Sequence, residues 1–182
     1  MIRHCLLLVA LVLAGAVDAA PVEQRYSVLV AGTRVGHLVA SIDADRIGID
    51  FDFKNNGRGP TMTEALVLGD DGLPVAWTIE GTTTFGSRVE ERFAWDGEQA
   101  RWTDATGSGE ATLGAARLYI GQGASPWALG VYARALLADA DRSLPVLPAG
   151  ELRLDPGESL EIDAGGSRAS VRVHSISGLS LG

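Results

Sequence analysis

Strict alternation of apolar and polar residues between about residues 24 and 103 is the feature that most constrains the fold of this chain. Ile47, Ile49 and Phe51 would share one side of the clearest strand, and the residues between them are polar or glycine. An antiparallel strand of this kind covers a core with one face and meets water with the other. Similar runs recur with short turns between them, so consecutive strands are predicted to pair as a meander.

The period changes near residue 125. Ser125 is a candidate N-cap, Pro126 suits the first helical position, and Tyr132 and Leu136 recur at helical spacing. These signals predict one amphipathic helix over residues 126–138.

The remaining segments are predicted to be short strands and turns. Residues 106–110 are expected to form a polar loop, and residues 155–158 (Asp-Pro-Gly-Glu) a type II turn between two strands. Residues 168–176 would form the last strand after a glycine-rich hairpin.

A sheet with one apolar face must bury that face against another element, and the chain offers one helix with a broad apolar stripe. The predicted fold is therefore mainly β: a curved antiparallel sheet, half-barrel-like, that wraps one α-helix and is preceded by a signal peptide helix. Residues 20–182 would form this single domain. A two-sheet sandwich is the alternative, and a closed barrel would leave the helix without a place.

Residues 1–19 at the N-terminus are predicted to form an export signal. The apolar run Cys5–Val17 is shorter than the roughly 20 residues that a membrane span needs. Small residues favour cleavage after Ala19, before Ala20, because cutting one residue later would place a proline after the bond. The expected location is periplasmic or extracellular, with no stable membrane span after cleavage; an uncleaved anchor or a buried core helix is the alternative.

The charge composition limits the classes of partner that the chain is expected to bind. The formal net charge is −8, and no basic run occurs anywhere in the chain. Such a surface repels phosphate backbones and anionic lipid surfaces, so nucleic acid is not expected as a partner. The single cysteine, Cys5, lies in the predicted signal segment, so no disulfide is expected.

The sequence contains no complete catalytic motif. His37 and His174 are the histidines outside the signal segment, and their surroundings match no metal-binding spacing. No serine stands in a nucleophile-elbow pattern, and the glycines before the helix do not complete a phosphate-binding pattern. No catalytic residue, metal or cofactor is predicted.

Two groups of residues remain as candidate binding positions. Aromatic and apolar side chains that could line a ligand cavity are Trp77, Trp127, Tyr132 and Leu136, for which the core is the competing assignment. A glycine-flanked loop offers an arginine that packing does not need, and its candidate docking residues are Asn55, Asn56, Gly57, Arg58 and Pro60.

Several short motifs resemble the N-terminal β-rich region that precedes the metal-dependent barrel of exported bacterial amidohydrolases. They are Tyr26-Ser27-Val28-Leu29, Phe51-Asp52-Phe53, the run from Asn55 to Pro60, Ala133-Arg134-Ala135-Leu136-Leu137, Leu147-Pro148-Ala149-Gly150-Glu151 and Ile176-Ser177-Gly178-Leu179. In that family the barrel binds its metal through four histidines and an aspartate. This chain has too few histidines for such a site, so the resemblance implies no hydrolase activity here.

The first functional hypothesis is a non-catalytic accessory domain, or a truncated form, of an exported amidohydrolase whose catalytic domain is encoded downstream. The alternative is a free-standing periplasmic module that binds an apolar ligand in a half-barrel cavity, because the sheet-plus-helix pattern looks like that of lipoprotein carriers. A third hypothesis is a small hydrolase that uses His37 or His174 in an unrecognised site.

Overall fold

The structure of the chain is a computed structural model that describes residues 20–178. The predicted signal peptide of residues 1–19, including Ala19, lies outside the described residues. Ala20 is the first described residue and is exposed.

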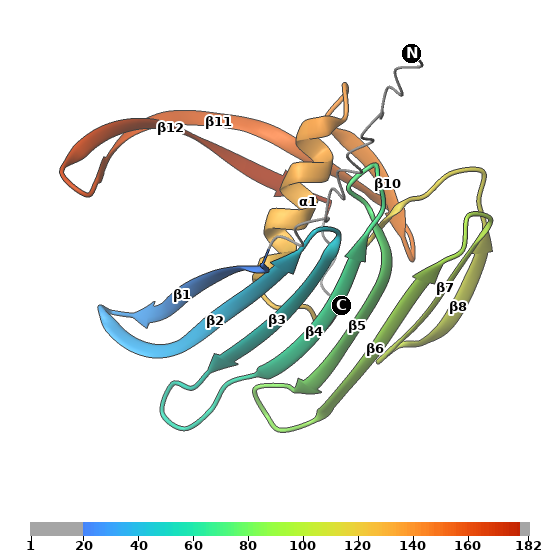
Figure 1. Cartoon of the computed structure of the whole chain (residues 1–182), viewed down its shortest axis with the longest axis horizontal. Helices are drawn as coiled ribbons and strands as arrows, with labels where there is room; N and C mark the ends of the chain where they lie inside the picture. The colour runs from blue at the N-terminus through green and yellow to red at the C-terminus, as the bar shows by residue number, and fades with distance from the viewer. Residues whose placement is uncertain (1–19, 179–182) are drawn as a thin grey trace, which may run out of the picture.

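The larger sheet contains eight strands, and each pairs antiparallel with the next one along the chain, in the order β1 to β8 (Figure 1). The strands are β1 (Val22–Val30), β2 (Thr33–Asp43), β3 (Arg46–Phe53), β4 (Thr61–Leu68), β5 (Pro74–Thr82), β6 (Arg88–Trp95), β7 (Gln99–Asp104) and β8 (Gly107–Thr112). The predicted meander is confirmed. The sheet is strongly curved, and its concave face carries the core.

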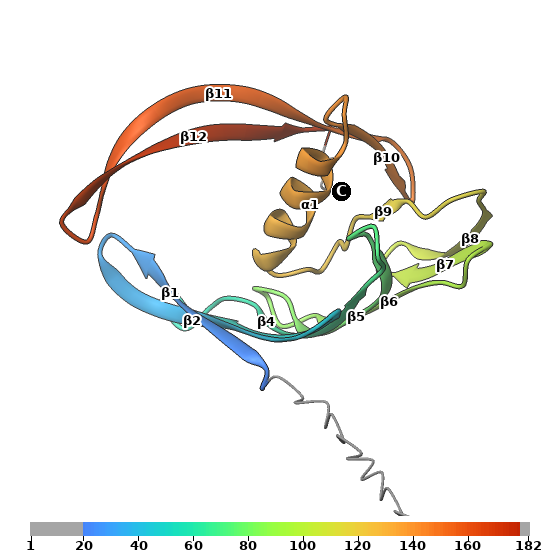
Figure 2. The same ribbon diagram turned by 45° about the horizontal axis from the view of Figure 1, so that its top comes forward.

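A second sheet of four strands faces that concavity (Figure 2). Its order is β12-β11-β10-β9, with β9 (Leu118–Tyr119), β10 (Ser143–Leu147), β11 (Glu151–Ala164) and β12 (Ser167–Ser177). The β9–β10 pair is parallel, and the other pairs are antiparallel. The predicted mainly β, half-barrel character is confirmed, but two sheets form where one was expected. The chain after the helix returns to pair with β9, and this pairing starts a separate sheet.

The one helix, α1 (Trp127–Ala138), lies between the two sheets and packs against β11 (Figure 2). Its extent agrees with the prediction over residues 126–138. The predicted cap is wrong by one residue: Pro126 occupies the N-cap position, and no side chain caps the helix. Val131 and Leu136 are almost fully buried and join the helix to the core.

Two local predictions are wrong, and glycine explains both. The expected loop near residues 106–110 is strand β8, in which Gly109 pairs with Trp102. A Cβ at Gly109 would lie 2.4 Å from the Trp102 ring, so glycine lets the strand pass the indole. The expected turn near Pro156 is a bulge within the continuous strand β11. A Cβ at Gly157 would lie 2.2 Å from the carbonyl oxygen of Val173, so the bulge brings the two backbones together.

Candidate ligand-binding groove

A groove of about 360 Å³ lies between the first three strands of the large sheet and one face of α1. Most of its lining is apolar or aromatic. The lining residues are Gln24, Tyr26, Val28, Leu38, Phe51, Pro126, Trp127, Gly130 and Arg134. Its volume falls at the lower end of the range for small-molecule sites in proteins.

The sheet wall of the groove follows from strand register. Tyr26 on β1 pairs with Leu38 on β2, which in turn pairs with Phe51 on β3. Directly paired residues of antiparallel strands point to the same face, so these three side chains form one row across the concave side. Leu38 and Phe51 are buried, whereas Tyr26 is 51% exposed and stands at the open edge.

The helix wall is formed by one face of α1. Trp127, Gly130 and Arg134 recur at spacings of three and four residues, which places them on the same side of a helix. The rings of Trp127 and Tyr26 approach with their centroids 6.2 Å apart, so the two aromatics close one side of the groove from opposite walls.

The helix is held over the sheet by a buried carboxylate, Glu64. Its Oε1 accepts a 2.6 Å hydrogen bond from the Ser125 amide, and its Oε2 accepts a 2.9 Å bond from the Trp77 indole. Glu64 is 2% exposed. The loop before α1 is therefore fixed to the middle of β4.

A second buried carboxylate, Glu91, holds the same loop. Its Oε1 accepts hydrogen bonds from the Tyr119 hydroxyl (2.6 Å) and the Gln122 amide (3.0 Å), and its Oε2 accepts one from the Gly123 amide (2.8 Å). Glu64 on β4 and Glu91 on β6 both pair with Ile79 on β5, so they stand two strands apart on one face. Every carboxylate oxygen has a donor, as buried charges require.

The electrostatics of this network follow from its burial. Burial raises the pKa of Glu64, while hydrogen bonds from Ser125 and Trp77 act in the opposite direction. Burial and the neighbouring Glu91 carboxylate raise the pKa of Tyr119 far above its usual value. Burial also raises the pKa of Tyr132, whose hydroxyl accepts a 3.0 Å bond from the Gly121 amide. Because each oxygen of the two carboxylates has a donor, Glu64 and Glu91 have a structural role: they fix the position of the loop before α1.

Sequence reasoning missed both carboxylates, although one signal was available. Glu64 lies two residues from Met62 and two from Leu66, so strand alternation places it on the apolar face of β4 with them. A charged residue at such a position needs buried partners, and the loop amides supply them.

The four predicted cavity residues fall into two groups in the structure, one in the groove and three in the core. Trp127 lines the groove. Trp77, Tyr132 and Leu136 are at most 3% exposed and belong to the core behind it. The Tyr132 and Trp77 rings meet in an edge-to-face arrangement, with the ring centroids 6.4 Å apart. Sequence reasoning missed all the other lining residues, Gln24 and Arg134 among them, because nothing local indicates that β1 and α1 share a cavity.

The predicted docking loop joins β3 to β4, and backbone geometry explains most of its composition. Asn55 pairs with Arg58, and Asn56 and Gly57 between them have positive φ, as a tight hairpin turn demands. A Cβ at Gly59 would lie 1.9 Å from the Phe53 carbonyl oxygen.

Pro60 accepts a 3.1 Å hydrogen bond from the Phe53 amide and completes the return of this loop. Arg58 is exposed and borders a surface hollow together with Phe85 of the β5–β6 loop. Phe85 is 85% exposed.

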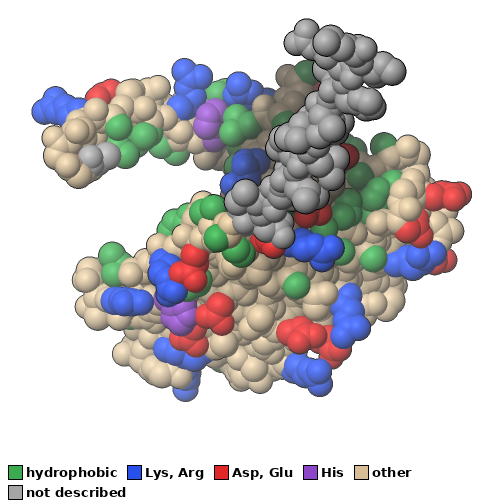
Figure 3. Space-filling view, viewed as in Figure 1, with side chains coloured by type: hydrophobic (Ala, Val, Ile, Leu, Met, Phe, Trp, Pro, Cys, Tyr) green, Lys and Arg blue, Asp and Glu red, His purple; other side chains and the backbone are tan. Residues whose placement is uncertain are grey.

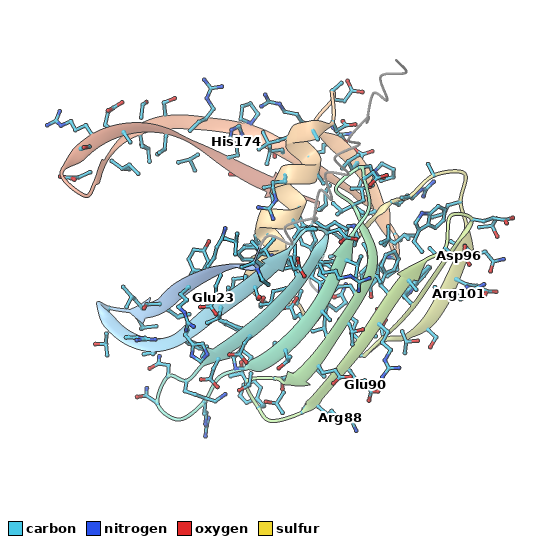
Figure 4. The ribbon with its side chains drawn as sticks, in the orientation of Figure 1. Glu23, Arg88, Glu90, Asp96, Arg101 and His174 are labelled. Atoms are coloured by element: carbon cyan, nitrogen blue, oxygen red, sulfur yellow. The ribbon has the colours of Figure 1, made fainter. Side chains whose placement is uncertain are left out.

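The histidines lie on different sheets. The His37 ring lies 2.7 Å from a carboxylate oxygen of Asp50 on the neighbouring strand β3. His174 projects from the β11–β12 hairpin (Figure 4). The Arg88–Glu90 ion pair (2.9 Å), also labelled in Figure 4, lies on β6 of the large sheet. Within residues 20–178, no group of three histidine, cysteine or acidic side chains is arranged to hold a metal ion.

Among the described residues, no helix combines the length and the apolar character needed to cross a bilayer. Comparison of the chain with models of known protein families, with curated proteins and with solved structures gives no match. The resemblance to the amidohydrolase N-terminal region therefore stays a prediction.

Proposed function

We propose that this chain is a non-catalytic binding module that holds an apolar small molecule in the groove between β1–β3 and α1. The observation that carries the proposal is the lining, in which aromatic rings from the sheet and the helix face an open cavity. Pockets with mostly apolar walls and a few polar groups are the usual form of small-molecule sites.

The surface around the groove supports this proposal. Hydrophobic side chains gather on the side of the β11–β12 arm that faces the large sheet, and along the facing rim of that sheet (Figure 3). Leu160, Ile162 and Val173 on the arm are 43–47% exposed, and Val22 and Tyr26 on β1 are 51–60% exposed. Exposed apolar patches of this kind mark ligand or interaction sites.

Native mass spectrometry and displacement of an apolar fluorescent dye test the proposal. Purified protein should bind the dye with one-to-one stoichiometry. Tyr26→Ala should weaken dye binding because it removes one of the two rings at the groove's side. The matched control is Phe85→Ala, because Phe85 is an exposed aromatic residue on a loop outside the groove. Tyr119→Phe would not serve as a control because Tyr119 is buried. Absence of dye binding would contradict the proposal.

A second candidate function keeps the accessory-domain hypothesis, in which the chain docks on an amidohydrolase catalytic domain. Its specific support is the pair of neighbouring loops at one end of the large sheet, where Arg58 and the exposed ring of Phe85 border one hollow. Arginine and aromatic side chains are the residues most often found at interface hot spots.

The coding sequence downstream of this chain tests that candidate. If it encodes a barrel with a His-x-His motif, the paired substitutions Arg58→Ala and Phe85→Ser should loosen the domain contact and increase protease cleavage between the domains. The absence of such a coding sequence would remove this candidate. Export of the chain belongs to both proposals and rests on residues 1–19; protein fractionation of the native host tests it.

A further inference from the structure

The groove contains one charged side chain, Arg134, and apart from Gln24 and the Tyr26 hydroxyl the side chains of its lining are apolar. Its guanidinium carbon lies 5.9 Å from the centre of the Trp127 ring. Its terminal nitrogens lie 3.8 and 3.9 Å from where a Cβ on Gly130 would stand, so the guanidinium lies over Gly130 on the helix wall. The cation–π contact with Trp127 orients it there.

Arg134 has no ion pair with any described residue, unlike Arg88, which pairs with Glu90 at 2.9 Å. A guanidinium carries five N–H donors and binds carboxylate or phosphate oxygens through charge-assisted bonds. A second donor stands on the sheet wall. The Tyr26 hydroxyl donates a 2.8 Å bond to Gln24 Oε1, which leaves the amide NH₂ of Gln24 available to a ligand.

We propose that the groove binds a single-chain anionic amphiphile, such as a free fatty acid, with its chain on the apolar wall and its anionic head on Arg134. This inference rests on the function proposed above and names its ligand. The volume of about 360 Å³ suits one alkyl chain better than a two-chain lipid. The overall charge of −8 opposes approach to an anionic bilayer, so the monomeric amphiphile is the favoured source.

The test compares matched ligands below their micellar concentrations by isothermal titration and tryptophan fluorescence. Decanoate and decyl phosphate supply the anion, 1-decanol is the neutral match and decyltrimethylammonium is the cationic one. Wild-type protein should bind both anions about tenfold more tightly than decanol, since bonds to a charged group add roughly that factor. The cationic ligand should bind most weakly.

Arg134→Gln should abolish the preference for anions, because it weakens decanoate binding far more than decanol binding, and Arg134→Lys should retain part of the preference. Arg168→Gln, an exposed arginine at the far end of the hairpin, is the control and should change neither affinity. Raising the salt concentration should weaken decanoate binding and not decanol binding.

The outcomes separate the two proposals. If decanoate and decanol bind equally and Arg134→Gln changes nothing, the binding module stands and the anionic ligand is wrong. If neither binds, both proposals fail together. Association with anionic two-chain phospholipid vesicles without binding of monomeric decanoate would overturn the single-chain ligand.

Discussion

The backbone amide of Ser125 donates a 2.6 Å hydrogen bond to Oε1 of Glu64, and this bond ties the entrance of α1 to the centre of the large sheet. The two residues lie far apart in the sequence but meet in the core, where each is at most 3% exposed. The helix wall of the groove therefore depends on a polar contact that no local sequence pattern specifies.

Removing the indole donor to this carboxylate should destabilise the protein. Trp77→Phe leaves Glu64 Oε2 without its 2.9 Å partner and opens a small void beside a residue that is 1% exposed. We expect a loss of about 1–3 kcal/mol in the free energy of unfolding, measured by urea denaturation. Trp95→Phe, at a half-buried position, is the control. Equal losses in the two variants would contradict the importance of the hydrogen bond.

The raised pKa of Glu64 predicts a particular dependence of stability on pH. The unfolded carboxyl loses its proton near 4.5, while the buried one retains it to a higher pH. Between these values the folded state binds more protons, so this group lowers stability as pH rises through that window, with no further change above it. Thermal unfolding of the wild type and Glu64→Gln as a function of pH measures the difference.

The carboxyls of Asp96 and Glu151 contribute in the opposite direction at lower pH. Hydrogen bonds from the Gln99 and Glu98 amides lower the pKa of Asp96, and those from Ser143 and Arg153 lower that of Glu151. Their stabilisation is lost as pH falls through the lowered values, below the Glu64 window. For Glu64 the contradicting result is specific. If the stability of the wild type relative to Glu64→Gln increases as the pH rises above 4.5, the raised pKa assigned to Glu64 is wrong.

A methyl group at Gly109 should disrupt the edge of the large sheet. Its Cβ would lie 2.4 Å from the Trp102 ring, so Gly109→Ala should cost about 1–3 kcal/mol of unfolding free energy. Gly114→Ala is the matched control, because a Cβ there meets nothing within 4 Å. Thermal unfolding and the intrinsic tryptophan fluorescence, to which Trp102 contributes, both report the change. An unaffected Gly109→Ala variant would refute the close packing.

Two neighbouring leucines of α1 provide a direct test of which helix face meets the core. Leu136 is fully buried, and Leu137 is 52% exposed. Leu136→Ala should lower the free energy of unfolding by about 2–5 kcal/mol, whereas Leu137→Ala should change it by less than about 0.5 kcal/mol. Chemical denaturation measures both. A larger effect of Leu137→Ala would mean that the helix is rotated relative to the described packing.

Local pattern was enough to predict the meander and the helix. The alternation around Ile47 and Phe51 reports the buried face of β3 directly, and both residues are buried. The period change near Pro126 likewise reports the start of α1. These features depend on residues close in sequence, where strand and helix periodicity act.

The second sheet and the groove depend on contacts between distant segments. The parallel pairing of Val146 with Leu118 has no local signature, and it separates the second sheet from the first. Pro156 and Gly157 are turn residues in isolation, but the approach of the Val173 backbone makes them a bulge. Arg134 could not be assigned to the groove from sequence, because the opposite wall of the groove comes from β1, β2 and β3.

The order of strands in the large sheet also bears on the kinetics of folding. Because each strand from β1 to β8 pairs with its successor, the sheet can close hairpin by hairpin through contacts of short sequence separation. The groove exists only after α1 docks on that sheet. A ligand that touches both walls should therefore slow unfolding while leaving the rate of sheet formation unchanged.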